Sequence, residues 1–268
     1  MKKHLKYSTL FAATAGVLGA LLRRWLLSAG TDANGLYPAF HPGWIGYLVL
    51  TLAAMAALWL ATREPGEDPT WNRNFPHGLP DSSVPNFYLH FSKVAFTAAG
   101  YALAAVGIGL YSRSLLPSSG RLEIAVCWSG FLCAAALLLL SVQIILGKAP
   151  ASLAHLLPCV YFALLLFLMG KQFSDEPELM RFLPQVAAIA ASALACYQLW
   201  GFAVGSGSRK NSLFWSMSAL YLCLAAAPGN HVLYIGLALW HLMSHCSLTI
   251  SPAEPEETQE IPQKESEE

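Results

Sequence analysis

Long apolar stretches fill most of this 268-residue chain, and they constrain its fold more than any other feature. The clearest of them runs from Val126 to Leu146 and contains no charged residue. Because the hydrocarbon core of a bilayer is about 30 Å thick, a spanning helix needs about 20 mostly apolar residues. Several stretches reach that length, so the chain is predicted to be a multi-pass protein of the cell membrane.

Eight stretches are candidates for membrane spans, and most of the connections between them are short. They cover residues 7–29, 44–62, 90–111, 124–146, 151–170, 182–204, 212–227 and 230–250. The stretch 212–227 is short; if it does not cross, seven spans remain and the termini lie on opposite sides. We therefore predict an all-α fold, a bundle of about eight transmembrane helices, with seven as the alternative.

The composition leaves no room for a second, soluble domain. Charged residues make up 12% of the chain, about half the share of a soluble domain, and no polar stretch is long enough to form one. We expect one transmembrane domain over residues 1–250 and a disordered tail over 251–268, which is rich in proline and glutamate. The formal net charge is zero, so the chain lacks the basic balance of a nucleic-acid-binding protein. The acidic tail offers a site for a protein partner.

The positions of lysine and arginine predict the orientation. With both termini inside, ten of these residues lie on the inner side and six on the outer side. This excess favours an N-in and C-in topology. The pair Arg23 and Arg24 works against it, because it makes the first span basic at both ends.

Small residues recur at helical spacing and predict where the helices touch, because transmembrane helices associate through close packing. The expected contact faces hold Ala12, Ala15, Gly16, Gly19 and Ala20 in the first span, Gly100, Ala104, Ala105 and Gly109 in the third, and Ala187, Ala191 and Ala195 in the sixth. Six cysteines lie inside apolar stretches with no CxxC pair. We interpret them as small core residues rather than as a disulfide framework.

Ionisable groups at membrane depth are costly, so each is a candidate for function. Arg23 and Arg24 lie near the end of the first span, and Asp32 follows shortly after them. These three residues form a candidate site for an anionic headgroup or substrate. The alternative is that the arginines extend to the interface and pair with Asp32 for structure only.

Two histidines form the most specific candidate metal site in the chain. His241 and His245 are four residues apart, which places both imidazoles on one helix face about 6 Å apart at Cβ. Such a pair can chelate zinc, and His155 would complete the set if its helix meets theirs at the same depth. No carboxylate in the span could act as a base, and the alternative is two histidines bonded to backbone, water or headgroups. The sequence names no cofactor.

One stretch of the chain carries a family resemblance. The segment 21–44, LLRRWLLSAGTDANGLYPAFHPGW, and the later WNRNFP at 71–76 resemble uncharacterised polytopic membrane proteins of Gram-positive gut bacteria. The matching residues are Arg24, Gly30, Asp32, Gly35, Leu36, His41, Pro42, Asn74, Phe75 and Pro76. The resemblance covers about the first third of the chain and implies no activity and no catalytic residue. It does imply that these two loops matter.

Three classes of function fit these observations. The sequence favours a non-enzymatic sensor or complex component, because few charged groups lie inside the spans and the acidic tail could bind a partner. The alternative is a small permease or a lipid-handling transporter, which fits the number of helices and the group of Arg23, Arg24 and Asp32. The third is a metal-dependent intramembrane enzyme that uses His241 and His245.

Overall fold

The computed structural model describes residues 2–29, 42–63, 87–117, 120–146, 152–174, 179–204 and 208–248. Within these ranges the chain forms eight α-helices and one short 3-10 helix. They are α1 (Lys2–Ala29), α2 (Pro42–Thr62), α4 (Phe87–Ser114), α5 (Arg121–Ile145), α6 (Ser152–Ser174), α7 (Leu179–Ala203), α8 (Arg209–Ala226), η1 (Ala227–Gly229) and α9 (His231–Leu248). The predicted all-α fold is confirmed.

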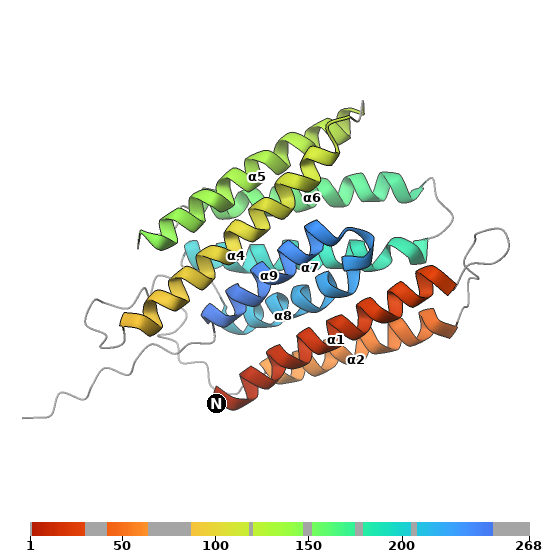
Figure 1. The fold of residues 1–268 in the computed structure, drawn as a ribbon, viewed down its shortest axis with the longest axis horizontal. Helices are drawn as coiled ribbons and strands as arrows, with labels where there is room; N and C mark the ends of the chain where they lie inside the picture. The colour runs from red at the N-terminus through yellow and green to blue at the C-terminus, as the bar shows by residue number, and fades with distance from the viewer. Residues whose placement is uncertain are drawn as a thin grey trace, which may run out of the picture.

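Seven of these helices are long and apolar enough to cross a membrane. They include α8, whose candidate span Lys210–Gly229 extends the short stretch expected at 212–227. The last helix, α9, is not among the seven, although the sequence suggested a span at 230–250. It is only 18 residues long, and three histidines lower its mean hydropathy. It nevertheless runs lengthwise through the bundle beside the candidate spans (Figure 1).

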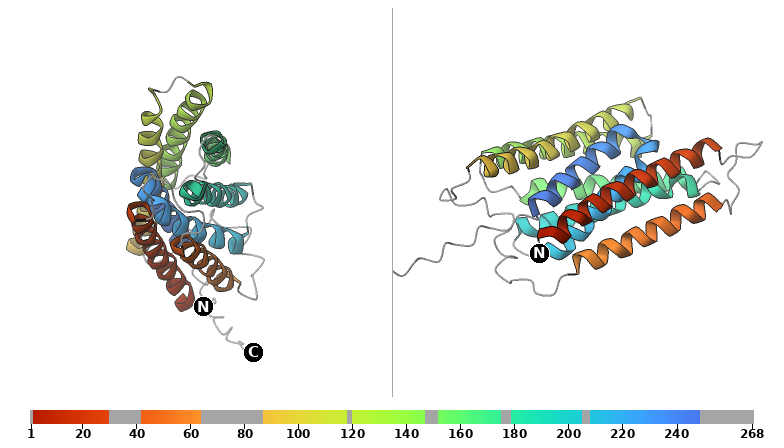
Figure 2. Two further views of the ribbon diagram at one scale, coloured as in Figure 1. Left: turned by 90° about the vertical axis from the view of Figure 1, so that its right-hand side faces the viewer. Right: turned by 60° about the horizontal axis from the view of Figure 1, so that its bottom comes forward.

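The helices pack as a six-helix circuit with a pair of helices on one side. Contacts lead from α4 to α5, α6, α7, α8 and α9, and from α9 back to α4. Helix α1 packs along α8, and α2 packs against α1 and α8. Seen along the bundle, α1 and α2 lie beside the circuit rather than within it (Figure 2). Helices α8 and α9 therefore have neighbours on most sides.

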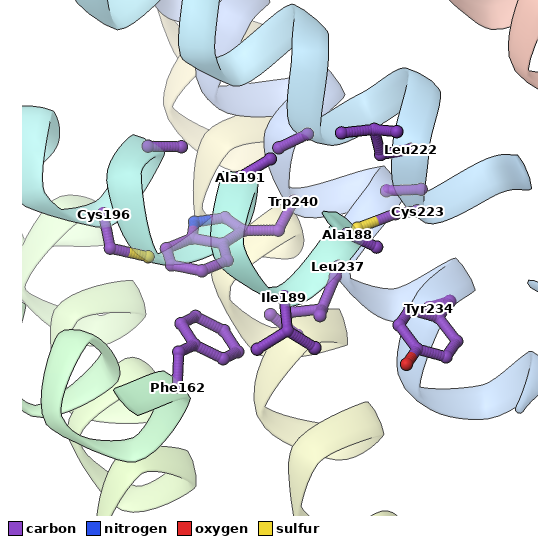
Figure 3. Close-up of a cluster of buried hydrophobic side chains, with 14 of the residues drawn as sticks. Phe162, Ala188, Ile189, Ala191, Cys196, Leu222, Cys223, Tyr234, Leu237 and Trp240 are labelled. Carbon is purple, nitrogen blue, oxygen red and sulfur yellow. The ribbon is translucent and has the colours of Figure 1, made fainter. Parts of the chain in front are cut away.

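Apolar side chains cover the outer surface as well as the interior, as expected where lipid replaces water. Large exposed residues include Val49 and Leu52 on α2, Leu132 on α5 and Phe167 on α6. The tightly packed interior holds aromatic and aliphatic side chains from every α-helix. Figure 3 shows the part of it to which α6, α7, α8 and α9 contribute. Of the five cysteines whose burial is described, four are buried, as predicted for core residues, and Cys159 is partly buried.

Small residues allow the helices to approach closely, as the sequence indicated. A Cβ atom added to Gly16 would lie 2.8 Å from Leu224 Cβ, and one added to Gly19 would lie 3.0 Å from Ala225 Cβ. These two glycines therefore let α1 lie directly against α8. The residues of the expected contact faces are buried or partly buried.

A further close approach was not predicted. Gly107 of α4 and Gly236 of α9 face each other, and a Cβ on Gly236 would lie 3.0 Å from the Leu103 carbonyl oxygen and 3.4 Å from Gly107 Cα. Backbone therefore meets backbone at this crossing of α4 and α9. The sequence patterns marked neither glycine, because each meets its partner on a different helix.

Candidate functional site

Helices α8 and α9 form a hairpin, and polar residues lie at matching depths on its two arms. Ser216 and His241 are equally far along their helices from the turn at Ala227–Gly229, about 15 Å at the usual helical rise. Ser212 and His245 are likewise equally far from it, one helical turn further along. All four side chains are buried. The hairpin thus gathers hydroxyls and imidazoles in one half of the bundle.

His241 is the centre of the best-defined contacts. Its Nε2 atom lies 3.0 Å from the Ser192 hydroxyl of α7, and that hydroxyl lies 3.4 Å from the Cys223 thiol of α8. His241 and Ser192 both have no solvent-exposed surface. A single serine therefore links the imidazole of α9 to the thiol of α8, so that three helices meet at one polar point.

His241 also lies at one end of a series of contacts between aromatic rings. The rings of His241 and Trp240 stack with centroids 5.1 Å apart, and Trp240 meets Tyr101 of α4 edge-on at 5.4 Å. The Tyr101 hydroxyl in turn lies 3.4 Å from His155 Nε2 on α6. Contacts thus run without a break from His155 through Tyr101, Trp240, His241 and Ser192 to Cys223, and we call these six residues the polar core.

Several buried hydroxyls of α8 have no hydrogen-bond partner in the part of the chain that the structure describes. They include Ser212 and Ser216, which share a face of α8 with Cys223 because they precede it by about three turns and two turns. The Nδ1 atom of His241 likewise has no hydrogen-bond partner among the described residues. A buried polar atom without a partner costs about 1–3 kcal/mol, so these atoms would bind a further polar group favourably.

The structure separates the two arginines that the sequence placed together. Arg23 is 1% exposed, whereas its neighbour Arg24 is exposed at the surface of the bundle. Arg23 Nη1 donates to the Ala226 carbonyl oxygen at 2.7 Å, at the end of α8. The helix dipole makes a C-terminal carbonyl group a favourable partner for a cation. The third member of this predicted site, Asp32, lies outside the described residues.

Arg23 sits in a polar environment of its own. A Cβ atom at Gly229 would clash with the Gln185 side chain and would lie 3.1 Å from Arg23 Nη2. The candidate ligand site thus has one buried cation, which bonds to the end of α8 beside the α8–α9 turn.

The three histidines of the predicted metal site have different surroundings. His155 and His241 belong to one chain of contacts, but the rings of Tyr101 and Trp240 stand between them. His245 is buried one helical turn beyond His241. Among the described residues, no three His, Cys, Asp or Glu side chains gather closely enough to hold a metal ion. The metal site on these histidines remains a prediction, without support from this arrangement.

Sequence reasoning missed the partner of His241. Ser192 is one of many serines in apolar stretches, and nothing in its own segment marks it. Tyr101 and Trp240 were also not singled out as partners, although Trp240 is only 1% exposed. Only the packing of α4, α7 and α9 brings these side chains together.

The fold, the apolar surface and the seven candidate spans define a multi-pass integral membrane protein built as a helical bundle. Comparison with protein-family models, with curated proteins and with solved structures finds no match.

Proposed function

We propose that this protein is a non-enzymatic sensor or complex component, in which the polar core is the part that responds to a ligand or partner. The observation that carries the proposal is the contact of His241 with Ser192, and through it with Cys223. Uncharged polar groups from three helices meet there in an apolar interior. A change in one of these contacts must alter how the three helices pack.

The unsatisfied atoms of α8 and of His241 would receive the signal. Ser212, Ser216 and His241 Nδ1 offer donors and acceptors that the described residues leave unused. A small polar molecule, or a polar segment of a partner protein, that bonds to them would remove their desolvation cost. Binding would then favour whichever spacing of α8 and α9 best fits the bound group.

Native mass spectrometry after mild detergent extraction tests this proposal. The wild type should carry a stoichiometric added mass, either a small molecule or a partner protein. His241→Ala should lose it, because the imidazole is part of the core. His231→Ala is a matched control, since His231 is exposed at the other end of α9. A wild-type chain that carries only heterogeneous lipid, or an added mass that survives His241→Ala, would overturn the proposal.

A small permease or lipid-handling transporter is the second candidate, and buried Arg23 is the observation in its favour. A cation held inside the bundle near a helix end is suited to an anionic headgroup or solute. Uptake in proteoliposomes distinguishes this candidate from the first. Transport that Arg23→Gln abolishes and Arg24→Gln preserves would establish the permease, and the absence of any uptake or lipid transfer would count against it.

The serine–histidine contact also has the form of a nucleophile and its general base. Both groups are fully buried, which suits a structural or binding role better than attack on a substrate. A fluorophosphonate probe, which labels activated serines, separates the two roles. We expect no labelling that depends on Ser192. Labelling of the wild type that disappears in Ser192→Ala would replace the sensor proposal with a hydrolase.

A further inference from the structure

Tyr221 of α8 reaches across to α2 with its hydroxyl group. The Tyr221 hydroxyl oxygen lies 2.9 Å from Thr51 Oγ1. The Thr51 hydroxyl donates to the Tyr47 carbonyl oxygen of its own helix at 2.8 Å, and because a hydroxyl has one hydrogen to donate, Tyr221 is the donor to Thr51. The tyrosine reaches α2 beside Gly19 of α1, where a Cβ atom would lie 3.7 Å from the hydroxyl oxygen. A single side chain thus bonds α8 to α2.

Cys223, two residues further along α8, faces the opposite side of that helix. An α-helix turns by about 200° over two residues. The Cys223 thiol accordingly lies 3.4 Å from the Ser192 hydroxyl of α7, which in turn lies 3.0 Å from His241 Nε2. Neither Tyr221 nor Cys223 has any solvent-exposed surface. Helix α8 therefore stands between α2 and the polar core and makes a side-chain hydrogen bond on both sides.

The end of α8 is fastened to α1. Arg23 donates to the Ala226 carbonyl oxygen at 2.7 Å, and two glycines of α1 let it lie directly against α8. These contacts resist sliding of α8 along its axis. A displacement of Tyr221 therefore turns or tilts α8, and Cys223 moves with it because a regular helix is rigid over two residues.

Among the seven candidate spans, α2 has the most surface facing outwards. Of its span, 22% is buried inside the bundle, the smallest share of the seven, whereas 72% of the α8 span is buried. Val49, Leu52 and Leu60 of α2 are each at least 60% exposed. A transmembrane helix adjusts to a thicker or thinner bilayer by changing its tilt. Bilayer thickness thus acts on α2 directly and on α8 through α2.

We propose that α8 transmits the tilt of α2 to the polar core, so that bilayer thickness regulates the contact of His241 with Ser192. The proposal rests on the polar core being the responsive part of the protein, and it adds the lipid bilayer as an input. When the tilt of α2 changes, Thr51 displaces Tyr221 and α8 turns. Cys223 then shifts against Ser192, and the bond from Ser192 to His241 changes with it.

Fluorine NMR of fluorotryptophan-labelled protein in nanodiscs of two thicknesses tests this proposal. Trp240 reports on the core, because its ring stacks on that of His241 with centroids 5.1 Å apart (Figure 3 labels Trp240), and Trp240→Phe assigns its resonance. In the wild type the resonance should differ between short-chain dimyristoleoyl and long-chain dierucoyl phosphatidylcholine. Thr51→Val and Tyr221→Phe each remove one hydroxyl of the bond, so each should abolish most of that difference.

Thr14→Val is the matched control, because the exposed Thr14 hydroxyl bonds to carbonyl groups of its own helix. It should respond to thickness as the wild type does. Thr51→Ser retains the hydroxyl and should restore the response, which separates loss of the bond from loss of the fold. A wild-type resonance that is the same in both bilayers would overturn the proposal, and so would an undiminished response in Thr51→Val and Tyr221→Phe. Failure of the proposed function is seen separately, as the absence of a bound mass in native mass spectrometry.

Discussion

The guanidinium of Arg23 donates a 2.7 Å hydrogen bond to the carbonyl oxygen of Ala226, a residue 203 positions away in the sequence. This contact fastens the end of α1 to the end of α8, next to the turn that leads into α9. Arg24, the next residue, is exposed and has no such role. Two adjacent arginines in the same helix therefore make different contributions, because a helix turns by about 100° between them.

Substitution of Arg23 should therefore destabilise the protein much more than substitution of Arg24. Arg23→Gln shortens the side chain and removes a charge-assisted hydrogen bond, so we expect a loss of about 1.5–3 kcal/mol. Arg24→Gln should change stability by less than about 0.5 kcal/mol, as is usual for exposed residues. Thermal unfolding of both variants in the same detergent measures the difference. Equal shifts in the two midpoints would show that the Arg23 contact does not hold α1 in place.

The backbone contact between α4 and α9 predicts a sharp difference between two glycines. Gly236→Ala would place a methyl group against the Leu103 carbonyl and Gly107, so it should force the helices apart and cost about 1–3 kcal/mol. Gly170→Ala is the control, because a Cβ at Gly170 would meet nothing within 4 Å. Its better helix propensity should leave stability unchanged or raise it slightly. Comparable losses in both variants would argue against the close crossing.

Two buried serines should respond in opposite ways to removal of the hydroxyl. Ser141 donates to the Ala98 carbonyl at 2.8 Å, so Ser141→Ala should cost about 0.5–1.5 kcal/mol. The Ser216 hydroxyl has no partner among the described residues. Ser216→Ala should therefore be neutral or stabilising in the purified, ligand-free protein, since a buried polar group is removed without loss of a bond.

The same serine gives a second readout once a bound mass has been found. Ser216→Ala should then lose that mass while keeping its stability. If Ser216→Ala is instead as destabilised as Ser141→Ala, the hydroxyl has a structural partner and does not belong to a binding site.

The class of fold was predictable because it depends on summed hydrophobicity. A stretch such as Val126–Leu146 has to be buried in lipid or protein whatever its neighbours are, so the sequence alone indicates a span. The small faces of α1 were predictable for a similar reason, because Gly16 and Gly19 leave a surface that only close packing can fill. The last helix was harder to assign, since its three histidines reduce its apolar character while its packing surface is retained.

The candidate site was only partly predictable. The spacing of His241 and His245 places both on one helix face, and both are buried. The cost of buried charge drew attention to Arg23 and Arg24 together, but only Arg23 is buried. The partners of these residues, Ser192 and Ala226, could not be found in this way. Both contacts depend on how distant helices pack, and neither a serine in an apolar stretch nor a backbone carbonyl carries a signal in one sequence.

The proposed role of the polar core requires that His241 and Ser192 act as one unit in the interior. A double-mutant cycle with Ser192→Ala and His241→Phe, measured by unfolding in one detergent or nanodisc system, tests it directly. Each single variant should leave a buried polar group without its bond, and the double variant should relieve part of that cost. We predict a coupling free energy of about 0.5–1.5 kcal/mol, the range for a hydrogen bond between transmembrane helices. Effects that add within about 0.3 kcal/mol would contradict the account, because they would show that the two side chains do not interact.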